Sequence, residues 1–332
     1  MTQEFFAGRR VLVTGAGGFI GSHLVEALIA QGAQVTAMLR YGSAASRGHL
    51  ADLTEEQLEQ VRWAQGDITD AEFVRATVAD HDTVFHLAAL IAIPYSYLAP
   101  RSYLRTNVEG TLNVLEAVRQ TGVPKLVHTS TSEVYGSARF VPMDESHPLQ
   151  GQSPYSASKI GADKMAEAYW RSFGTPAVTV RPFNTFGPRQ SARAVIPATI
   201  LQGLWCREVR LGSMAPVRDM TYVSDTVSGF LAAAATPGLE GKTFNLGTGE
   251  GHAVGDIVRL ALRLLGREGD IQDDPARHRP AASEVDRLVS SNDAFRAATG
   301  WMPRVGLEEG LVRTIAWLRA RGRPADPGSY AR

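Results

Sequence analysis

Cysteine is almost absent from this chain of 332 residues, which holds Cys206 alone. A single cysteine cannot close an internal disulfide or build a cysteine-rich metal site, and the histidines lack a matching ligand spacing. The chain also lacks any apolar run of roughly 18 residues, and Met1 to Arg10 holds no stretch typical of a signal peptide. These absences predict a cytoplasmic protein without a bound metal and without a membrane partner.

A surplus of charge of one sign is missing as well. Lys and Arg total 34, Asp and Glu also total 34, and no long block of either sign occurs. This balance argues against a nucleic-acid partner and against a basic patch that binds membranes. A chain of this length buries a sizeable core, which indicates one large domain or a nucleotide-binding domain with a smaller appendage.

The first half of the chain contains short β-branched runs that alternate with longer helical patterns. Strands are predicted at Val11–Val13, Gln34–Leu39, Val61–Ala64, Thr83–Leu87 and Lys125–Thr129, and helices at Ile20–Ala30 and Tyr103–Gln120. This alternation is typical of an α/β fold, a doubly wound, Rossmann-like parallel sheet with helices on both faces. Such a sheet binds its ligand beyond the carboxyl ends of the strands.

Beyond about residue 185, Gly and Pro interrupt the pattern more often, although Val254–Leu265 and Leu307–Arg319 still have the periodicity of amphipathic helices. We therefore predict a nucleotide-binding domain over residues 1–185. A smaller, mainly substrate-binding lobe over residues 186–321 follows, with some segments that return to the sheet. Residues 322–332 are predicted to form a tail.

A glycine-rich turn follows the first strand directly, with the sequence Gly-Ala-Gly-Gly-Phe-Ile-Gly over residues 15–21. Gly15 permits a tight turn, Gly18 lets the backbone approach a pyrophosphate, and Gly21 allows the helix to pack closely on the strand. The helix that begins here offers free N–H groups and positive potential to phosphates. Because the glycines lie between a strand and a helix, the turn predicts a dinucleotide cofactor held by Gly15, Gly18, Phe19 and Ile20.

The end of the second strand indicates which dinucleotide is bound. An Asp or Glu that holds the ribose hydroxyls of NAD is expected there, but Leu39 and Arg40 occupy the place. A cation suits the 2′-phosphate of NADP, with Ser43 as a further contact, so NADP is favoured over NAD; an ordinary exposed arginine is the alternative. Asp67 and Ile68 follow the third strand and are placed to meet the adenine ring.

Tyr155 and Lys159 lie four residues apart at the start of a predicted helix that runs to Phe173, so they share a helix face. A tyrosine with a pKa of about 10 is a poor base at neutral pH. A nearby ammonium group and a positive nicotinamide ring both favour its phenolate, which then accepts a proton from a substrate hydroxyl. The hydroxyls of residues 129–132 follow the predicted fifth strand and face the same crevice.

Together these motifs resemble the extended short-chain dehydrogenases/reductases of the NAD-dependent epimerase/dehydratase family, which act on nucleotide sugars. The similarity runs from about Arg9 to Arg319. Further matching segments are His86–Ala89, Asn107–Thr111, Arg181–Asn184, Gly187–Arg189, Arg218–Asp219, Tyr222–Asp225 and Asn245–Gly247.

The resemblance implies the contacts of both ligands. Cofactor contacts are implied at Leu87, Ala88, Ala89, Thr129, Tyr155, Lys159 and Pro182, and substrate contacts at Tyr95, Asn184, Arg189, Val195, Arg218 and Arg279. Among these, Asn184, Arg218 and Arg279 are expected to hold the diphosphate, since arginines bind phosphate oxygens in a fork geometry. The resemblance also implies a homodimer, formed through the helices at Tyr103–Gln120 and Tyr155–Phe173.

Members of this family first oxidise carbon 4 of the sugar, and Glu133 predicts the next step. The ketone acidifies the hydrogen on carbon 5, a carboxylate removes it, and the carbon-6 hydroxyl leaves as water. Hydride returned to carbon 6 completes a 4,6-dehydration. The catalytic group is then Thr131, Ser132, Glu133, Tyr155 and Lys159. Glucose-type dehydratases have an Asp–Glu pair here, whereas Ser132–Glu133 resembles the GDP-mannose type and leaves the acid open.

Other reactions stay open from the sequence. The run Thr-Ser-Glu-Val-Tyr-Gly also occurs in UDP-glucuronate decarboxylases, and 4-epimerases share the oxidation step. The segments Leu87–Tyr97 and Gln190–Pro197 resemble dehydratases of amino-sugar pathways such as legionaminic acid synthesis, which favours a nucleotide-linked hexose or N-acetylhexosamine. We therefore expect a lyase, a nucleotide-sugar 4,6-dehydratase. A cofactor-binding regulator without catalysis is a remote alternative, against which the intact Tyr155 and Glu133 argue.

Overall fold

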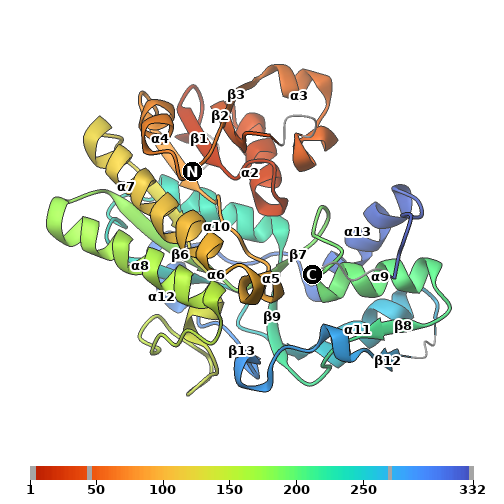
Figure 1. Ribbon diagram of the computed structural model, residues 1–332. Coiled ribbons are helices and arrows are strands. Elements are labelled where there is room, and N and C mark those ends of the chain that lie inside the picture. The colour runs from red at the N-terminus through yellow and green to blue at the C-terminus, as the bar shows by residue number, and fades with distance from the viewer. Residues whose placement is uncertain (1–4, 43–46, 268–270, 329–332) are drawn as a thin grey trace.

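The computed structural model describes residues 5–42, 47–267 and 271–328. Its centre is a parallel sheet of seven strands in the order β10-β6-β5-β4-β1-β2-β3 (Figure 1). The strands are β1 (Arg10–Thr14), β2 (Gln34–Arg40), β3 (Val61–Gly66), β4 (Thr83–His86), β5 (Leu126–Thr129), β6 (Ala177–Pro182) and β10 (Thr243–Leu246). This sheet confirms the predicted doubly wound α/β fold, and each of the five predicted strands is present.

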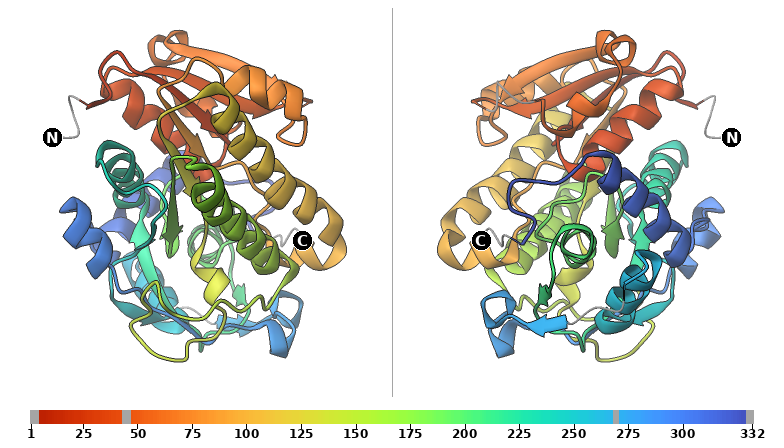
Figure 2. Two further views of the ribbon diagram at one scale, coloured as in Figure 1. Left: turned by 90° about the vertical axis from the view of Figure 1, so that its left-hand side faces the viewer. Right: turned by 90° about the vertical axis from the view of Figure 1, so that its right-hand side faces the viewer.

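Helices cover both faces of the sheet. On one face α4 (Ala71–Val78), α7 (Gly110–Thr121) and α8 (Pro154–Phe173) pack against one another; on the other, α2 (Phe19–Ala30) packs against α10 (Val223–Ala235). Figure 2 shows α7 and α8 side by side in one view and α2 in the opposite view. Strand residues alternate between the two cores, since Val11 and Val13 join the α2 side and Leu12 the α7 side.

The helix predicted from Tyr103 to Gln120 is longer and less regular than expected. It begins as α6 (Pro100–Tyr103), continues through a π-helical segment, η2 (Leu104–Glu109), and ends as α7. The short helix α5 (Ile93–Leu98) precedes it. Gly122, with φ of 72°, ends α7 in the left-handed conformation that glycine adopts without strain.

The second half of the chain builds a smaller lobe, which lies at the lower right of Figure 1. Its helices are α9 (Val195–Trp205), α11 (Val254–Leu264) and α13 (Leu307–Ala320), and its strands are β7 (Asn184–Phe186), β8 (Val209–Leu211), β9 (Val217–Tyr222), β11 (Gly251–Ala253), β12 (Ile271–Asp273) and β13 (Arg287–Leu288). Helix α12 (Asp293–Thr299) instead contacts β10 of the large sheet. Strand β10 nevertheless pairs with β6 of the large sheet. The domain division at residue 185 stays a prediction.

Three short helical elements complete the part of the chain that bears on function: η1 (Gly48–Asp52), α3 (Glu55–Glu59) and η3 (Ser132–Tyr135). Strand order reverses beside β1, whose neighbours are β2 on one side and β4 on the other. In open α/β sheets the ligand crevice lies at such a reversal, outside the carboxyl ends of the strands. Across the described residues, no helix is both long and apolar enough to cross a membrane.

Candidate active site

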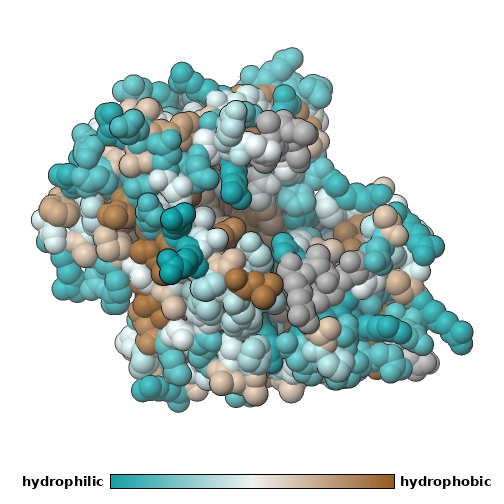
Figure 3. Space-filling view, viewed as in Figure 1, coloured by the Kyte–Doolittle hydropathy of each residue, from teal (hydrophilic) through white to brown (hydrophobic). Residues whose placement is uncertain are grey.

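A cleft of about 1210 Å³ opens at the carboxyl ends of the central strands. Figure 3 shows the surface hollowed between the part that contains the sheet and the smaller lobe. Segments that follow β1, β3, β4, β5 and β6 form one wall, and the chain from residue 190 onward forms the other. A site for one drug-sized ligand measures roughly 300–1,000 Å³, so this cleft has room for two ligands at once.

The glycine turn is shaped so that two of its positions accept only glycine. Gly15 has φ of +70°, and a Cβ atom there would lie 2.8 Å from the backbone nitrogen of Ala88. A Cβ atom at Gly21 would collide with the carbonyl oxygen of Gly15, so the helix packs closely on the turn. Gly18 caps α2, whose first turn carries no acidic side chain and lines the cleft. This geometry fits an anionic group such as a pyrophosphate.

Arg40 and Asp67 lie together at the rim of the cleft, at the ends of β2 and β3. Arg40 Nε is 3.8 Å from Asp67 Oδ2, and the Arg40 side chain is largely exposed. Asp67 Oδ1 accepts hydrogen bonds from the backbone and the hydroxyl of Thr69, and these bonds with the charge of Arg40 lower the pKa of Asp67. A ligand phosphate at Arg40 therefore competes with a carboxylate. Ser43 lies outside the described residues.

Tyr155 and Lys159 lie at the start of α8, where Ser153 and Ser156 form a capping box. Both side chains are buried. Burial raises the pKa of Tyr155 well above its ordinary value, and a hydrogen bond with Thr131 acts in the opposite direction. Burial lowers the pKa of Lys159 to about 8. Lys159 Nζ donates a hydrogen bond to the carbonyl oxygen of Thr129 at 2.6 Å, which fixes the ammonium group beneath the strand end.

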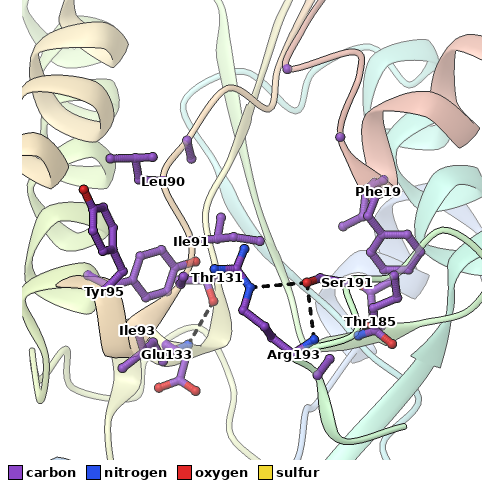
Figure 4. A pocket seen from close by; sticks show the side chains of 18 of the residues that line it. Phe19, Leu90, Ile91, Ile93, Tyr95, Thr131, Glu133, Thr185, Ser191 and Arg193 are labelled. Carbon is purple, nitrogen blue, oxygen red and sulfur yellow. Dashed lines mark hydrogen bonds between the residues drawn. The ribbon is translucent and has the colours of Figure 1, made fainter. Parts of the chain in front are cut away.

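The turn after β5 presents Thr131, Ser132 and Glu133 to the cleft. Thr131 Oγ1 accepts a hydrogen bond from the backbone nitrogen of Glu133 at 3.2 Å and caps η3 (Figure 4). Glu133 Oε1 lies 3.4 Å from Arg279 Nη1, a loose contact across the cleft. Thr131 thus fixes the backbone of Glu133, whose carboxylate contacts Arg279, in the lining that also contains Tyr155.

Most other predicted contacts also line the cleft. They are Phe19, Ile20, Ile68, Leu87, Ala88, Ala89, Thr129 and Pro182 for the cofactor and Tyr95, Asn184, Val195, Arg218 and Arg279 for the substrate. The charged side chains of the lining are mostly cationic, which suits phosphorylated ligands. Among the described residues, no cluster of His, Cys, Asp or Glu could hold a metal ion.

Arg189 is the exception among the predicted substrate contacts. It lies outside the lining of the cleft, with Arg189 Nη2 at 2.8 Å from Glu26 Oε2 and Nε at 3.5 Å from Asp52 Oδ2. Its buried guanidinium thus forms ion pairs with a carboxylate on α2 and with another on η1. Arg189 therefore joins the loop after β7 to these elements, and its predicted contact with a substrate stays a prediction.

Arg193 is a cleft residue that sequence reasoning missed. It extends from the lobe wall, beside Ser191, toward Ile91 and Thr131 on the opposite wall (Figure 4). The segment around it resembles substrate-proximal sequence, but one exposed arginine carries no pattern of its own. Asp163, beneath Lys159, was missed as well, although its helical spacing from Lys159 is a usable signal.

The chain matches the family model described as GDP-mannose 4,6 dehydratase over residues 12–314. A dTDP-glucose 4,6-dehydratase of Mycolicibacterium smegmatis is 36% identical, over 94% of this chain and 93% of that protein. A UDP-glucose 4-epimerase of the same organism is 31% identical, over 95% of this chain and 100% of that protein.

Among solved structures, the dTDP-glucose 4,6-dehydratase DesIV of Streptomyces venezuelae with bound NAD superposes with a TM-score of 0.85 at 30% identity. The match covers 94% of this chain and 97% of that one. Sequence, fold and cleft agree, and the chain belongs to the NAD-dependent epimerase/dehydratase family of nucleotide-sugar enzymes, in the group that the GDP-mannose 4,6 dehydratase model describes.

Proposed function

We propose that this chain is a nucleotide-sugar 4,6-dehydratase, which converts a nucleotide-linked hexose or N-acetylhexosamine into its 4-keto-6-deoxy form. The observation that carries the proposal is the position of Glu133. Glu133 lines the cleft together with Thr131 and Tyr155, and Thr131 holds its backbone nitrogen. A hydride-transfer site needs no carboxylate at this place, whereas removal of a proton from carbon 5 does.

A nicotinamide dinucleotide, when bound, supplies the acceptor and donor of hydride for the transient oxidation at carbon 4. The glycine turn, Asp67, Ile68, Lys159 and Pro182, which all line the cleft, would hold it. DesIV carries NAD, but the end of β2 in this chain has Arg40 and no acidic residue. This supports NADP as the preferred cofactor. Equilibrium titration of Arg40→Ala and wild type with both dinucleotides tests it, since only NADP affinity should fall.

Four side chains act in the proposed reaction, and two of them, Tyr155 and Glu133, transfer protons. Tyr155 takes the proton of the carbon-4 hydroxyl, and Thr131 donates a hydrogen bond to that oxygen. The ammonium group of Lys159 favours the phenolate form of Tyr155. Glu133 then removes the hydrogen of carbon 5 as a proton and passes it to the leaving hydroxyl of carbon 6, which departs as water. The hydride that a bound dinucleotide takes from carbon 4 would return to carbon 6, carbon 5 regains a proton from solvent, and Tyr155 releases the proton that it took. The sugar therefore loses one water in total.

A panel of nucleotide sugars, with products analysed by mass, tests the proposal. Dehydration gives a product lighter by one water, and we expect this result with a hexose or N-acetylhexosamine. Unchanged mass across a panel with inverted carbon 4 would instead identify a 4-epimerase, the alternative that the similarity to the UDP-glucose 4-epimerase favours. Loss of carbon dioxide from a uronate would identify a decarboxylase. If no sugar of the panel reacts, the alternative that remains is a cofactor-binding regulator without catalysis.

We also propose a homodimer formed through α7 and α8. Leu104 on η2 and Trp170 and Phe173 on α8 keep exposed fractions of 56%, 38% and 58%. Large apolar side chains in one surface region mark interaction sites. Light scattering of the purified protein should give a dimer mass, and Phe173→Glu should shift it toward the monomer.

A further inference from the structure

Asp163 lies one helical turn after Lys159 and has its carboxylate buried between α8 and the sheet. Its Oδ2 accepts hydrogen bonds from Ser130 Oγ at 2.8 Å and from Arg181 Nε at 3.0 Å. His128 Nε2 lies 3.2 Å from its Oδ1. Burial alone would raise the pKa of Asp163, but the hydrogen bonds with His128 and Ser130 and the charge of Arg181 lower it, so the group stays ionised.

These contacts also hold both ends of the turn that carries Thr131 and Glu133. Ser130 stands directly before the turn. At its other end, Tyr135 Oη accepts a hydrogen bond from Arg181 Nη1 at 2.9 Å and donates one to Asn245 Oδ1 at 2.6 Å. One buried carboxylate therefore joins the helix of Tyr155 and Lys159 to the turn of the proposed base.

The carboxylate also balances the buried charge of Lys159. The titratable and charged groups around Tyr155 and Lys159 are Tyr103 on α6, His86 on β4, His128 on β5, Glu133 on η3, Asp163 on α8 and, beyond Asp163, Arg181 on β6. Burial lowers the pKa of Lys159, and Asp163 opposes that effect. The pKa of Tyr155 is raised by burial first, and by Asp163 as well.

We propose that Asp163 is a positioning residue for catalysis, which sets the separation of α8 from the Thr131–Glu133 turn and keeps Lys159 protonated at the working pH. Asp163 touches neither ligand position and lies outside the lining of the cleft. It acts through Lys159 and Ser130, and this role rests on the proposed function.

The test is Asp163→Asn in the full chain, loaded with nicotinamide dinucleotide and assayed on the nucleotide sugar that wild type converts. We expect kcat to fall about 10- to 100-fold, as for a misplaced catalytic group, with KM changed less than about threefold. Loss of the negative charge lowers the pKa of both Tyr155 and Lys159, so both limbs of the kcat–pH profile should move toward acid by about one pH unit. A purely structural role would lower kcat equally at all pH values and leave the limbs in place.

Three variants separate charge from geometry. Asp163→Glu keeps the charge but lengthens the side chain, so kcat should fall while the limbs stay at the wild-type pH. Ser130→Ala removes one hydrogen bond and no charge, and should lower kcat about 3- to 10-fold with unmoved limbs. Asp225→Asn is the matched control, since this buried carboxylate binds the backbone of Arg304 and Val305 away from the cleft. It should alter stability without altering the profile.

The outcomes are distinct from those of the proposed function. If wild type converts a nucleotide sugar and Asp163→Asn has unmoved or alkaline-shifted limbs, the role of Asp163 is overturned. If Asp163→Asn does not fold, the Ser130→Ala variant decides: a kcat equal to that of wild type would overturn the proposed role of Asp163. If wild type converts nothing, the proposed function fails, and tyrosinate absorbance of the cofactor-loaded protein tests Asp163 without substrate. The tyrosinate signal of Tyr155 is identified as the one that Tyr155→Phe lacks. It should appear at lower pH in Asp163→Asn than in wild type.

Discussion

The two walls of the cleft are built in different ways. The wall formed by the sheet carries the glycine turn, Tyr155, Lys159 and the Thr131–Glu133 turn. Hydrogen bonds of 2.6–3.2 Å hold Lys159, Ser130 and the backbone of Glu133 in place. The wall formed by the lobe carries Arg218, which is buried, and Arg193, which is exposed and whose hydrogen bonds with Ser191 measure 3.4 Å. This difference fits the proposed function, in which the sheet wall would perform the chemistry and the lobe wall would select the sugar.

Tyr155→Phe should show the largest effect, because it removes the proposed acid–base hydroxyl from the sheet wall. We expect kcat to fall by about 10³- to 10⁴-fold, since the ring still fills its buried site and only proton transfer is lost. Steady-state rates with the identified substrate measure it. Dinucleotide affinity and melting temperature serve as controls and should stay near wild type. A variant with wild-type kcat would remove Tyr155 from the mechanism.

Glu133→Gln should lower the rate of dehydration about 10²- to 10³-fold while the oxidation at carbon 4 still occurs. The amide cannot take the proton of carbon 5, but Tyr155 and Thr131 are untouched. Single-turnover absorbance of the nicotinamide should therefore show a reduced form that accumulates, which wild type does not show. Glu72→Gln, which changes an exposed carboxylate on α4 outside the cleft lining, is the matched control. If Glu133→Gln forms the dehydrated product at the wild-type rate, the base must be sought elsewhere.

Arg193→Ala should have a smaller effect, because it alters an exposed side chain on the lobe wall. A hydrogen bond to a charged group contributes about 1.5–3 kcal/mol when fully formed, so KM should rise by roughly tenfold with kcat nearly unchanged. Arg101→Ala is the matched control, an exposed arginine outside the cleft lining, and should leave KM unaltered. A drop in kcat without a change in KM would instead give Arg193 a role in the chemical step, together with the residues of the sheet wall.

Arg189→Ala should change kinetics least of all. The guanidinium is buried against Glu26 and Asp52 on the side of α2, so its loss should lower the free energy of unfolding by about 2 kcal/mol. Denaturant unfolding measures this value. KM should stay within about twofold of wild type. A large rise in KM at unchanged stability would support the substrate role that the sequence first suggested.

The same contrast explains what the sequence could predict. Gly15, Gly21, Tyr155 and Lys159 have roles set by local spacing, because a strand–turn–helix or one helix face fixes them within a few residues. The five strands were found for the same reason. The roles of Asp163 and Arg189 depend instead on partners far along the chain, such as Arg181 and Glu26, which no local pattern brings together. Arg193 was missed because its neighbours across the cleft belong to another element.

Wild-type turnover in deuterium oxide tests the central claim most directly, since it follows both the oxygen and the proton that Glu133 is proposed to move. Purified enzyme is incubated with the nucleotide sugar, and the product is analysed by mass and by nuclear magnetic resonance. The account predicts a product that lacks one water and carries one deuterium, at carbon 5. A product of unchanged composition with inverted carbon 4 and no deuterium at carbon 5 would contradict it.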